Sequence, residues 1–421
     1  MSMKLRIDSV GTRIAAIPLV IIAALLLVVP RAEGADRTTQ AAAKGTATTD
    51  MGAPIVVGLD ADMSKGAAQG GEAIRRGIVI AIDEINAAGG VLGRPLKLVV
   101  RDHRGNPARG VDNINDFAEM EDLVAVVGGV HTPVALAELE SLHEHEIIYL
   151  GPWAAGTPIV ENGRNPNYVF RLSVRDQYAG GFLINAARER GYKRPGLLLW
   201  RTGWGRSNEK AMTDALHQLG QEPAGVQWFN SSQKDMSQEI KALIDAGADV
   251  VMLVANPVDG VMAVNSMAEL PAGERLPIIS HWGITGGDFH AQAAGVIESV
   301  ELTFLQTYSF FEPPFPERAA HFSEAYCAAF GGCRSTADII SPVGTAHAYD
   351  LIHLLKLAIE EVGTIDRKSV RDALERIEHY SGLVRDYAPP FTSTRHDALD
   401  ASDFRLCRYD RTGAIVPVAV Q

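Results

Sequence analysis

Residues 74–100 read IRRGIVIAIDEINAAGGVLGRPLKLVV, and this stretch decides the fold. Isoleucines at positions 74, 78, 82 and 85 recur at the three- and four-residue spacing of an α-helix that buries one face. Gly89 and Gly90 stop that helix, and the apolar run at 96–100 reads as a buried strand. A β-branched run at 55–59 precedes the helix. The stretch is therefore the centre of a β-α-β unit, which implies a parallel sheet and a right-handed crossover.

The same alternation of strand and helix runs on along the chain and then restarts. We expect strands at 55–59, 96–100, 124–127, 147–150, 197–200, 226–229, 250–254 and 278–279. Helices are expected between them, and the C-terminal third adds helices near 316–330, 343–362 and 367–377 and a last strand near 404–409. Two successive runs of this kind predict an α/β chain with two doubly wound, Rossmann-like lobes.

Composition narrows the class of protein. Of 421 residues, 47% are hydrophobic and 21% are charged, which is ordinary globular usage and argues against disordered, collagen-like and coiled-coil chains. The formal net charge is −12 and no long basic run occurs, so nucleic acid is not an expected partner. Three cysteines are too few for a disulfide-built scaffold or a four-cysteine zinc site, and no metal is expected.

Residues 1–34 have the composition of a secretory signal peptide. Lys4, Arg6 and Arg13 precede an apolar run at 14–29, and Ala32-Glu33-Gly34 supplies small residues where a signal peptidase reads. The run is shorter than the roughly 18 residues of a spanning helix, so cleavage is the favoured interpretation and a retained membrane anchor the alternative. Residues 35–53, rich in Ala, Thr and Gly, are expected to form a flexible lead-in.

An exported chain meets an oxidising compartment, and this bears on the cysteines. Cys327 and Cys333 flank Gly331-Gly332, so a local disulfide and two separate thiols are both open interpretations. Cys407 is left over in either case.

Sequence signatures of catalysis are missing. No G-x-S-x-G, Walker P-loop, H-E-x-x-H or G-x-G-x-x-G pattern occurs in the chain. An exported two-lobed α/β protein without these patterns favours binding over chemistry, and no cofactor is expected.

A ligand is expected beyond the carboxyl ends of the strands. Ser64 follows the first predicted strand, Arg104 follows the second, and Asn256 follows a strand of the second run. Arg104 could pair with an anionic ligand, and an ordinary solvated surface is the alternative.

The sharpest candidate lies after the third strand, where His131 and Thr132 precede Pro133. Thr is a good N-cap and Pro is preferred in the first turn, so Thr132 should open the helix at 134–145 with its hydroxyl and free N–H groups exposed. A helix N-terminus carries partial positive charge and can hold a carboxylate. A simple cap is the alternative interpretation.

Three of the five tryptophans fall at predicted strand ends, namely Trp153, Trp204 and Trp282. Trp combines a large apolar area with one N–H donor, as small-molecule pockets use. Packing is the alternative interpretation of each Trp taken alone, and their gathering at predicted strand ends favours a role for at least one of them in lining a cleft.

Several of these residues lie in motifs that resemble a known family. The stretch IAIDEINAAGGVLGR at 80–94 is similar to the most recognisable segment of the Leu/Ile/Val-binding protein family, the type I periplasmic solute-binding proteins of ABC importers. Shorter matches occur at Val126-Val127-Gly128, Val169-Phe170-Arg171, Trp204-Gly205, Tyr349-Asp350 and the PFTSTRH segment at 390–396. The resemblance covers residues 54–415.

The resemblance implies two lobes joined by three crossover strands, with a ligand captured between them by hinge closure. The crossovers would fall near 171–174, 304–307 and 381–384. Lobe 1 would then contain 54–172 plus 305–381, and lobe 2 would contain 173–304 plus 382–421. The resemblance also implies a periplasmic location, an ABC permease of the inner membrane as partner, and a monomer.

The resemblance also implies site residues, position by position. Thr132 stands where the family grips an amino acid's α-carboxylate with Ser or Thr. Ala154 and Ala155 stand where a backbone carbonyl and a small hydroxyl residue are usual, and the hydroxyl is missing. Trp204 matches an aromatic residue before Gly.

In the second lobe the family's pattern is broken. An aromatic residue is usual near Asn256, and an acid that pairs with the α-ammonium is usual near Trp282. Neither is found, and the nearest acids, Asp259 and Asp288, are displaced. A buried ammonium needs a countercharge or full hydrogen bonding.

We therefore expect a solute-binding protein that takes a carboxylate with an apolar or aromatic body. An amino acid or a short amide is the alternative ligand. Two other functions compete: a sensor module anchored by an uncleaved 14–29 segment, and an exported enzyme of the same shape.

Overall fold

The computed structural model describes residues 52–231 and 233–418. The predicted signal peptide and nearly all of the predicted lead-in lie outside the described residues. Within the described ranges, no helix is both long and apolar enough to cross a membrane.

Lobe 1 is built on a five-stranded sheet in the order β2-β1-β3-β4-β5, and every pairing in it is parallel. Its strands are β1 (Ile55–Ala61), β2 (Leu96–Asp102), β3 (Leu123–Gly128), β4 (Ile148–Gly151) and β5 (Val169–Arg171). Every residue of β3 and β4 is buried. Continuous burial is the mark of parallel strands covered by helices on both faces.

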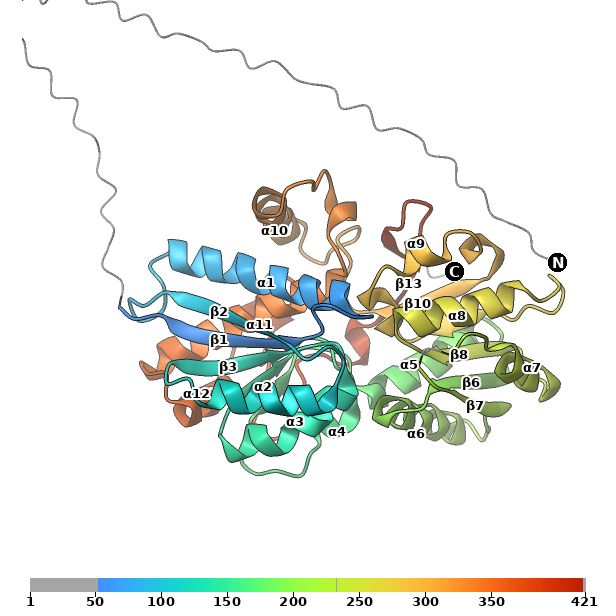
Figure 1. Ribbon diagram of the computed structural model, residues 1–421, viewed down its shortest axis with the longest axis horizontal. Coiled ribbons are helices and arrows are strands. Elements are labelled where there is room, and N and C mark those ends of the chain that lie inside the picture. Colours follow the sequence, from blue (N-terminus) through green and yellow to red (C-terminus); the bar gives the residue numbers. More distant parts are fainter. Residues whose placement is uncertain (1–51, 232, 419–421) are drawn as a thin grey trace, which may run out of the picture. The chain divides into compact units, whose positions relative to one another are not determined.

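Helices cover both faces of this sheet, as Figure 1 shows. On one face α1 (Ala68–Ala87) packs against α11 (Pro342–Val362), and on the other lie α2 (Pro107–Ala118) and α3 (Thr132–Glu144). The isoleucines that predicted α1 are buried. At Gly77 a Cβ would come within 2.1 Å of the Thr345 carbonyl oxygen, so only glycine lets α1 and α11 approach this closely.

The remaining helices of lobe 1 are short or lie at its edge. They are α4 (Thr157–Val160), α10 (Pro316–Ala329), η3 (Thr336–Asp338) and α12 (Arg367–Leu374).

Lobe 2 is built on a seven-stranded sheet in the order β14-β13-β10-β9-β8-β6-β7. Its strands are β6 (Pro195–Trp200), β7 (Gly225–Phe229), β8 (Val250–Val254), β9 (Ile278–Ser280), β10 (Leu302–Gln306), β13 (Arg405–Tyr409) and β14 (Ile415–Pro417). The pairings from β7 to β10 are parallel, whereas β13 pairs antiparallel with both β10 and β14.

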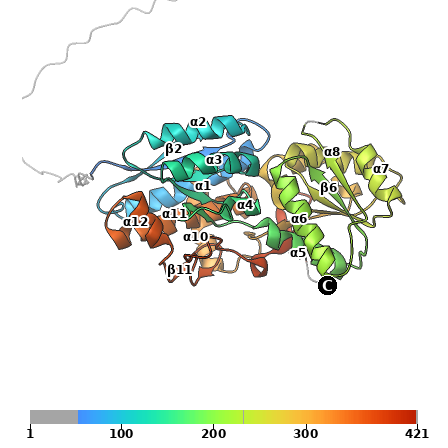
Figure 2. The same ribbon diagram turned by 90° about the horizontal axis from the view of Figure 1, so that it is seen from below.

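Two helix pairs flank this second sheet, and Figure 2 shows them on its opposite faces. They are α5 (Asp176–Glu189) with α6 (Gly203–Gln218), and α7 (Ser237–Asp245) with α8 (Pro257–Ala268). Shorter pieces are η1 (Trp282–Gly286), α9 (Phe289–Ala293), η2 (Ile297–Ser299) and η4 (Ala401–Asp403).

The structure confirms the predicted fold class, with two parallel-sheet lobes, and corrects its details. The strand at β10 was predicted only as a crossover, and β14 shows that the strand near 404–409 is not the last. Both are five residues or shorter and carry little periodic signal.

Buried polar contacts fasten the segments that connect the two lobes. Arg171, at the end of β5, pairs with Asp397 at 2.5 Å, and both side chains are almost completely buried. The Asp350 carboxylate of α11 accepts hydrogen bonds from the backbone N–H groups of Leu383 and Val384. Leu383 and Val384 lie in the turn of the small hairpin formed by β11 (Tyr380–Ser381) and β12 (Asp386–Tyr387).

Candidate functional site

The three tryptophans predicted at strand ends meet where the two lobes contact each other. Trp153 of lobe 1 packs against Trp282 of lobe 2 with ring centroids 5.7 Å apart, and each is 1% exposed. His281 lies between Trp282 and Trp204, with its ring centroid 6.1 Å from the first and 5.1 Å from the second. We call these four residues, Trp153, Trp282, His281 and Trp204, the aromatic row.

The aromatic row leads to a buried acid that sequence reasoning missed. The indole N–H of Trp204 donates to Oδ1 of Asp176 at 3.2 Å, and His281 Nε2 lies 3.2 Å from the same oxygen. His281 Nδ1 accepts the backbone N–H of Trp282, so its ring hydrogen is on Nε2, which makes no hydrogen bond to any described residue. Asp176 and His281 are both fully buried.

Several buried polar atoms around this acid have no hydrogen-bond partner among the described residues. They are Oδ2 of Asp176, Nε2 of His281, Oδ1 of Asn208 and Nε1 of Trp153. Asn208 is held in place by its own amide, which donates to the Trp204 carbonyl oxygen at 3.2 Å. Unpaired buried polar atoms are costly, so each one in a folded protein calls for an explanation.

Thr132 lies at the N-terminus of α3, but not in the predicted position. His131 is the N-cap, and Thr132 is the first residue of the helix. Its hydroxyl is not exposed, because the residue is 2% exposed and Oγ1 accepts the backbone N–H of Gly156 at 3.2 Å. Pro133 in the first turn fits the observed start, since its missing N–H has no partner to lose there.

The loop that follows β4 joins Thr132 to lobe 2. The Gly156 carbonyl accepts from Arg171, and the next residue, Thr157, donates its N–H to the Ser207 hydroxyl of α6 at 3.2 Å. The carbonyls of Ala154 and Ala155, predicted as ligand contacts, already accept from Arg171 and from the Asp176 N–H, at 3.5 and 2.9 Å.

The other predicted residues are placed less centrally. Ser64 and Arg104 are both exposed and both contact Asp102, through a 2.6 Å hydrogen bond and a 3.4 Å ion pair. Asn256 is the N-cap of α8, and its Oδ1 lies beside Gly283, next to the Trp204 ring.

His131 faces a second histidine rather than the aromatic row. Its ring packs edge-on against His103 with centroids 5.6 Å apart. Burial lowers the pKa of His131 and lowers the pKa of His103 to about 4, so neither ring favours the charged form.

The first turns of α11 form a further wall that the sequence did not predict. His347 bridges the Pro152 carbonyl and the Thr307 hydroxyl, each at 2.8 Å, and its ring lies 5.9 Å from Trp282. Burial lowers the pKa of His347 to about 4, so this ring is neutral at physiological pH. The helix was predicted from its periodicity, but its approach to the aromatic row depends on tertiary packing.

A hollow on lobe 2 lies away from the aromatic row, between α5 and β13. Its volume is about 1350 Å3, and residues such as Phe182, Thr303 and Leu406 line it. None of the predicted site residues lines this hollow. The buried polar side chains Asp176, His281 and Asn208 lie at the aromatic row instead.

Comparisons with known proteins identify the family and the fold. The family model described as periplasmic binding protein matches residues 54–414. A Leu/Ile/Val-binding protein homolog from Brucella abortus is 26% identical over 254 residues, covering 60% of this chain and 67% of that protein.

Two solved structures share the fold. A branched-chain amino acid transporter substrate-binding protein from Streptococcus pneumoniae, in complex with isoleucine, has a TM-score of 0.73 at 19% identity and covers 87% of this chain and 100% of that one. An ABC transporter solute-binding protein from R. palustris, in complex with 4-hydroxybenzoate, has a TM-score of 0.73 at 17% identity and covers 87% and 96%. With two parallel-sheet lobes meeting at a buried polar and aromatic site, this chain belongs to the periplasmic binding protein family, within its Leu/Ile/Val-binding group.

Proposed function

We propose that this protein is the solute-binding component of an ABC importer and that it captures a small carboxylate-bearing ligand between its lobes by hinge closure. The observation that carries the proposal is the meeting of both lobes at one buried site. There the N-terminus of α3 from lobe 1 and the Trp204–Asp176–His281 group from lobe 2 are joined through the loop at Gly156.

Thr132 supports the carboxylate part of the proposal. Its Oγ1 already accepts from the Gly156 N–H, so the hydroxyl hydrogen is left to be donated. The first backbone N–H groups of α3 have no partner within the helix, and this end of the helix carries partial positive charge. A ligand carboxylate placed there would receive donors without needing a Lys or Arg.

Asp176 supports an amine on the same ligand. Oδ1 of this buried carboxylate has one N–H donor, Trp204, while Oδ2 has none, and no ion pair of the described residues brings Lys or Arg to it. A buried charge without a cation is expensive, and a ligand ammonium would neutralise it. We therefore place amino-acid-like ligands first and purely aromatic or aliphatic acids second. The related structures with isoleucine and with 4-hydroxybenzoate show that this fold accepts both kinds of carboxylate.

A thermal-shift and tryptophan-fluorescence screen of the chain from Ala35 tests the proposal. The panel pairs each amino acid with its counterpart lacking the amine: L-leucine with isocaproate, L-phenylalanine with hydrocinnamate. Leucinamide, which lacks the carboxylate, is the control, and benzoate and 4-hydroxybenzoate complete the panel. A bound ligand stabilises the folded chain by mass action and so raises its melting temperature. At a free ligand concentration of a hundred times Kd, the free energy of unfolding increases by about 2.7 kcal/mol.

The pairs give distinct outcomes. Binding of L-leucine or L-phenylalanine, with loss on removal of either the carboxylate or the amine, supports the full proposal. Binding of the amine-free acids alone would keep the carboxylate site and reject the role of Asp176. Binding of leucinamide as tightly as L-leucine would reject the carboxylate anchor.

We further propose that the protein acts in the periplasm after removal of residues 1–34, as a monomer that delivers its ligand to a permease. Mass spectrometry of the exported protein locates its N-terminus. A mature chain that begins near Ala35 supports this, whereas a retained 14–29 segment favours the membrane-anchored sensor. Light scattering with and without ligand measures the oligomeric state.

A further inference from the structure

One hydrogen bond joins the start of α11 in lobe 1 to the turn that carries Trp282 in lobe 2. The hydroxyl of Ser341 donates to the Thr285 carbonyl oxygen at 2.7 Å, and the two residues are 5% and 2% exposed. The Thr285 hydroxyl in turn donates to the Trp282 carbonyl at 2.8 Å. Thr285 therefore links Ser341 to Trp282, a member of the aromatic row.

A close backbone approach lies beside this bond. A Cβ built on Gly70, in α1, would come within 3.0 Å of the Gly286 carbonyl oxygen of η1. Lobe 1 and the η1 turn are thus in contact at two neighbouring points, and separation of the lobes would break both.

The backbone of Ser341 is held in an unusual conformation. Its φ is 39° and its ψ is 69°, in the left-handed region that a residue with a side chain seldom adopts. Although Ser341 stands at the N-cap of α11, its side chain makes no cap bond to that helix. The side chain is committed to Thr285, and such a conformation persists only where the surroundings enforce it.

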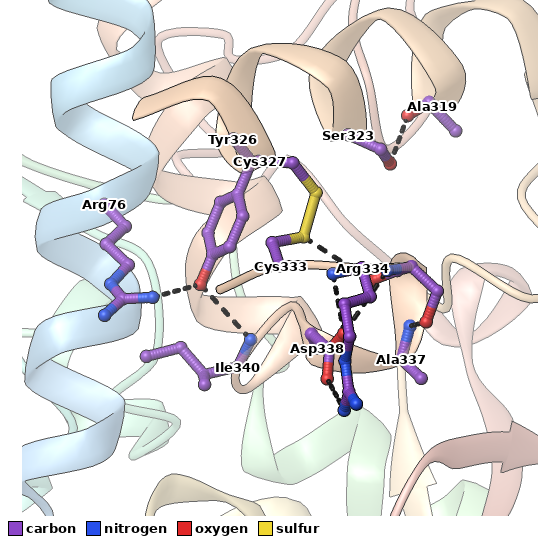
Figure 3. The surroundings of a disulfide bond; sticks show 11 residues. Arg76, Ala319, Ser323, Tyr326, Cys327, Cys333, Arg334, Ala337, Asp338 and Ile340 are labelled. Atoms are coloured by element: carbon purple, nitrogen blue, oxygen red, sulfur yellow. Dashed lines mark hydrogen bonds and ion pairs between the residues drawn. A yellow bond between two sulfur atoms is a disulfide. The ribbon is translucent and has the colours of Figure 1, made fainter. Parts of the chain in front are cut away.

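The segment that leads to Ser341 is held by the disulfide and its neighbours, shown in Figure 3. The Cys327–Cys333 disulfide ties the end of α10 to the start of the 334–340 segment. Tyr326, next to Cys327, ties the other end, because its hydroxyl accepts the Ile340 N–H at 3.4 Å. The same hydroxyl accepts from Arg76 of α1 at 2.8 Å, which anchors it to lobe 1. Both ends of the segment before Ser341 are therefore fixed from one turn of α10.

We propose that the Ser341–Thr285 bond is a latch for the closed lobes, and that the Cys327–Cys333 disulfide orders the 334–340 segment so that the latch can form. The redox state of this disulfide then sets ligand affinity from outside the binding site. The proposal rests on the proposed function, since a latch changes affinity only when the ligand is held between the lobes.

The thermodynamics follow from chain entropy. A dithiol reduces the bridge by giving two electrons and two protons, which leaves two Cys thiols and the dithiol as a cyclic disulfide. The freed segment samples more conformations, so ordering it for closure costs more. A smaller fraction of molecules is closure-competent, and the apparent Kd rises in proportion.

The test uses the full mature chain and two readouts. The first is hydrogen–deuterium exchange of the 282–286 turn without ligand, and the second is the Kd for L-leucine by calorimetry. The variants are Ser341→Ala, Ser341→Gly and the paired Cys327→Ser and Cys333→Ser. Ser323→Ala is the matched control, because the Ser323 hydroxyl bonds only to the Ala319 carbonyl within its own helix.

We expect Ser341→Ala and the paired cysteine variant each to speed exchange of the 282–286 turn and to raise Kd two- to tenfold. The two changes together should be no worse than the larger alone, because both act through one bond. Ser341→Gly should behave like Ser341→Ala if the hydroxyl matters. A glycine variant like wild type would assign the effect to the backbone and overturn the latch.

Unchanged exchange of the 282–286 turn in Ser341→Ala overturns the latch. Additive losses in the combined variant overturn its link to the disulfide. If L-leucine and the rest of the ligand panel fail to bind wild type, the proposed function fails and the exchange readout alone decides the latch.

Discussion

The indole N–H of Trp204, in the first turn of α6, donates to the carboxylate of Asp176, the first residue of α5, at 3.2 Å. The bond ties together the N-termini of two helices that pack side by side on lobe 2. It also fixes which oxygen of the carboxylate is used by the protein, because Oδ1 accepts from Trp204 and lies 3.2 Å from His281 Nε2, while Oδ2 has no partner among the described residues.

Asp176→Asn is expected to weaken an amine-bearing ligand selectively. The amide oxygen of Asn can still accept from Trp204, so the variant removes the charge while keeping that hydrogen bond. Calorimetry should show L-leucine affinity falling more than tenfold, or about 1.4 kcal/mol, with hydrocinnamate changed by less than threefold. Equal losses for both compounds would mean that Asp176 only positions Trp204.

Thr132→Ala is expected to weaken every carboxylate ligand by more than tenfold. The variant removes the hydroxyl donor at the start of α3 and the acceptor of the Gly156 N–H at the same time. Thr132→Ser keeps the hydroxyl and serves as the control, with affinity within threefold of wild type. Calorimetric affinities that are the same for wild type and Thr132→Ala would rule out the anchor.

Arg171→Met is expected to destabilise the fold by about 3–5 kcal/mol, because it removes the 2.5 Å partner of the buried Asp397 and leaves the longer 3.6 Å pair with Arg175. It also removes the donor to the Gly156 carbonyl. Arg411→Met is the matched control, since Arg411 and Glu298 form an exposed pair whose loss should cost less than about 0.5 kcal/mol. Urea denaturation measures both. Similar midpoints for the two variants would contradict the role of the buried pair.

Two neighbouring buried carboxyl groups of lobe 1, Asp60 at the end of β1 and Glu138 of α3, give its stability a pH dependence. Burial raises the pKa of Asp60 to about 7, and burial beside Asp60 raises the pKa of Glu138 well above its usual value. Asn113 of α2 donates to Asp60, and Asp102 of β2 repels its charge. Tyr149 of β4 also faces the pair, and Arg171 of β5 faces Tyr149.

The sign of the effect follows from proton binding. The folded chain keeps these protons above the pH, near 4, at which the unfolded chain loses them. Their stabilisation is therefore full below about pH 4 and is lost as the pH rises through about 7. Glu138→Gln should flatten the fall in melting temperature between about pH 5 and about pH 8. The lowered pKa values of His103 and His347 act in the opposite direction but are common to both proteins. Parallel curves for wild type and variant would contradict the assignment.

The sequence predicted the fold better than the site, and particular residues show why. The isoleucines of α1 recur with the period of a helix, and the short buried runs of β3 and β8 have the length of a strand. The three-residue β14 has neither, and its pairing with β13 comes from tertiary contact.

For the candidate site, the rule that ligands lie at strand ends led to Trp153, Trp204 and Trp282, and these do gather where the lobes meet. Asp176 was missed because it begins a helix after a crossover, not a loop after a strand. From the sequence, Asp259 and Asp288 were the nearest acids, because they lie closest to Asn256 and Trp282 along the chain. Sequence distance does not report that His281 Nε2 lies 3.2 Å from Asp176, over a hundred positions earlier.

The contact between Trp153 and Trp282 gives the protein an intrinsic spectroscopic signal. The two indoles come from different lobes, and their ring centroids are 5.7 Å apart at an angle of 48°. Chromophores at this distance and tilt couple their electronic transitions and give circular dichroism in the near ultraviolet. When the lobes separate, the coupling disappears while the secondary structure stays intact. An unlabelled sample can therefore report the fraction of closed molecules in real time, without a dye, an attached probe or a radioactive solute.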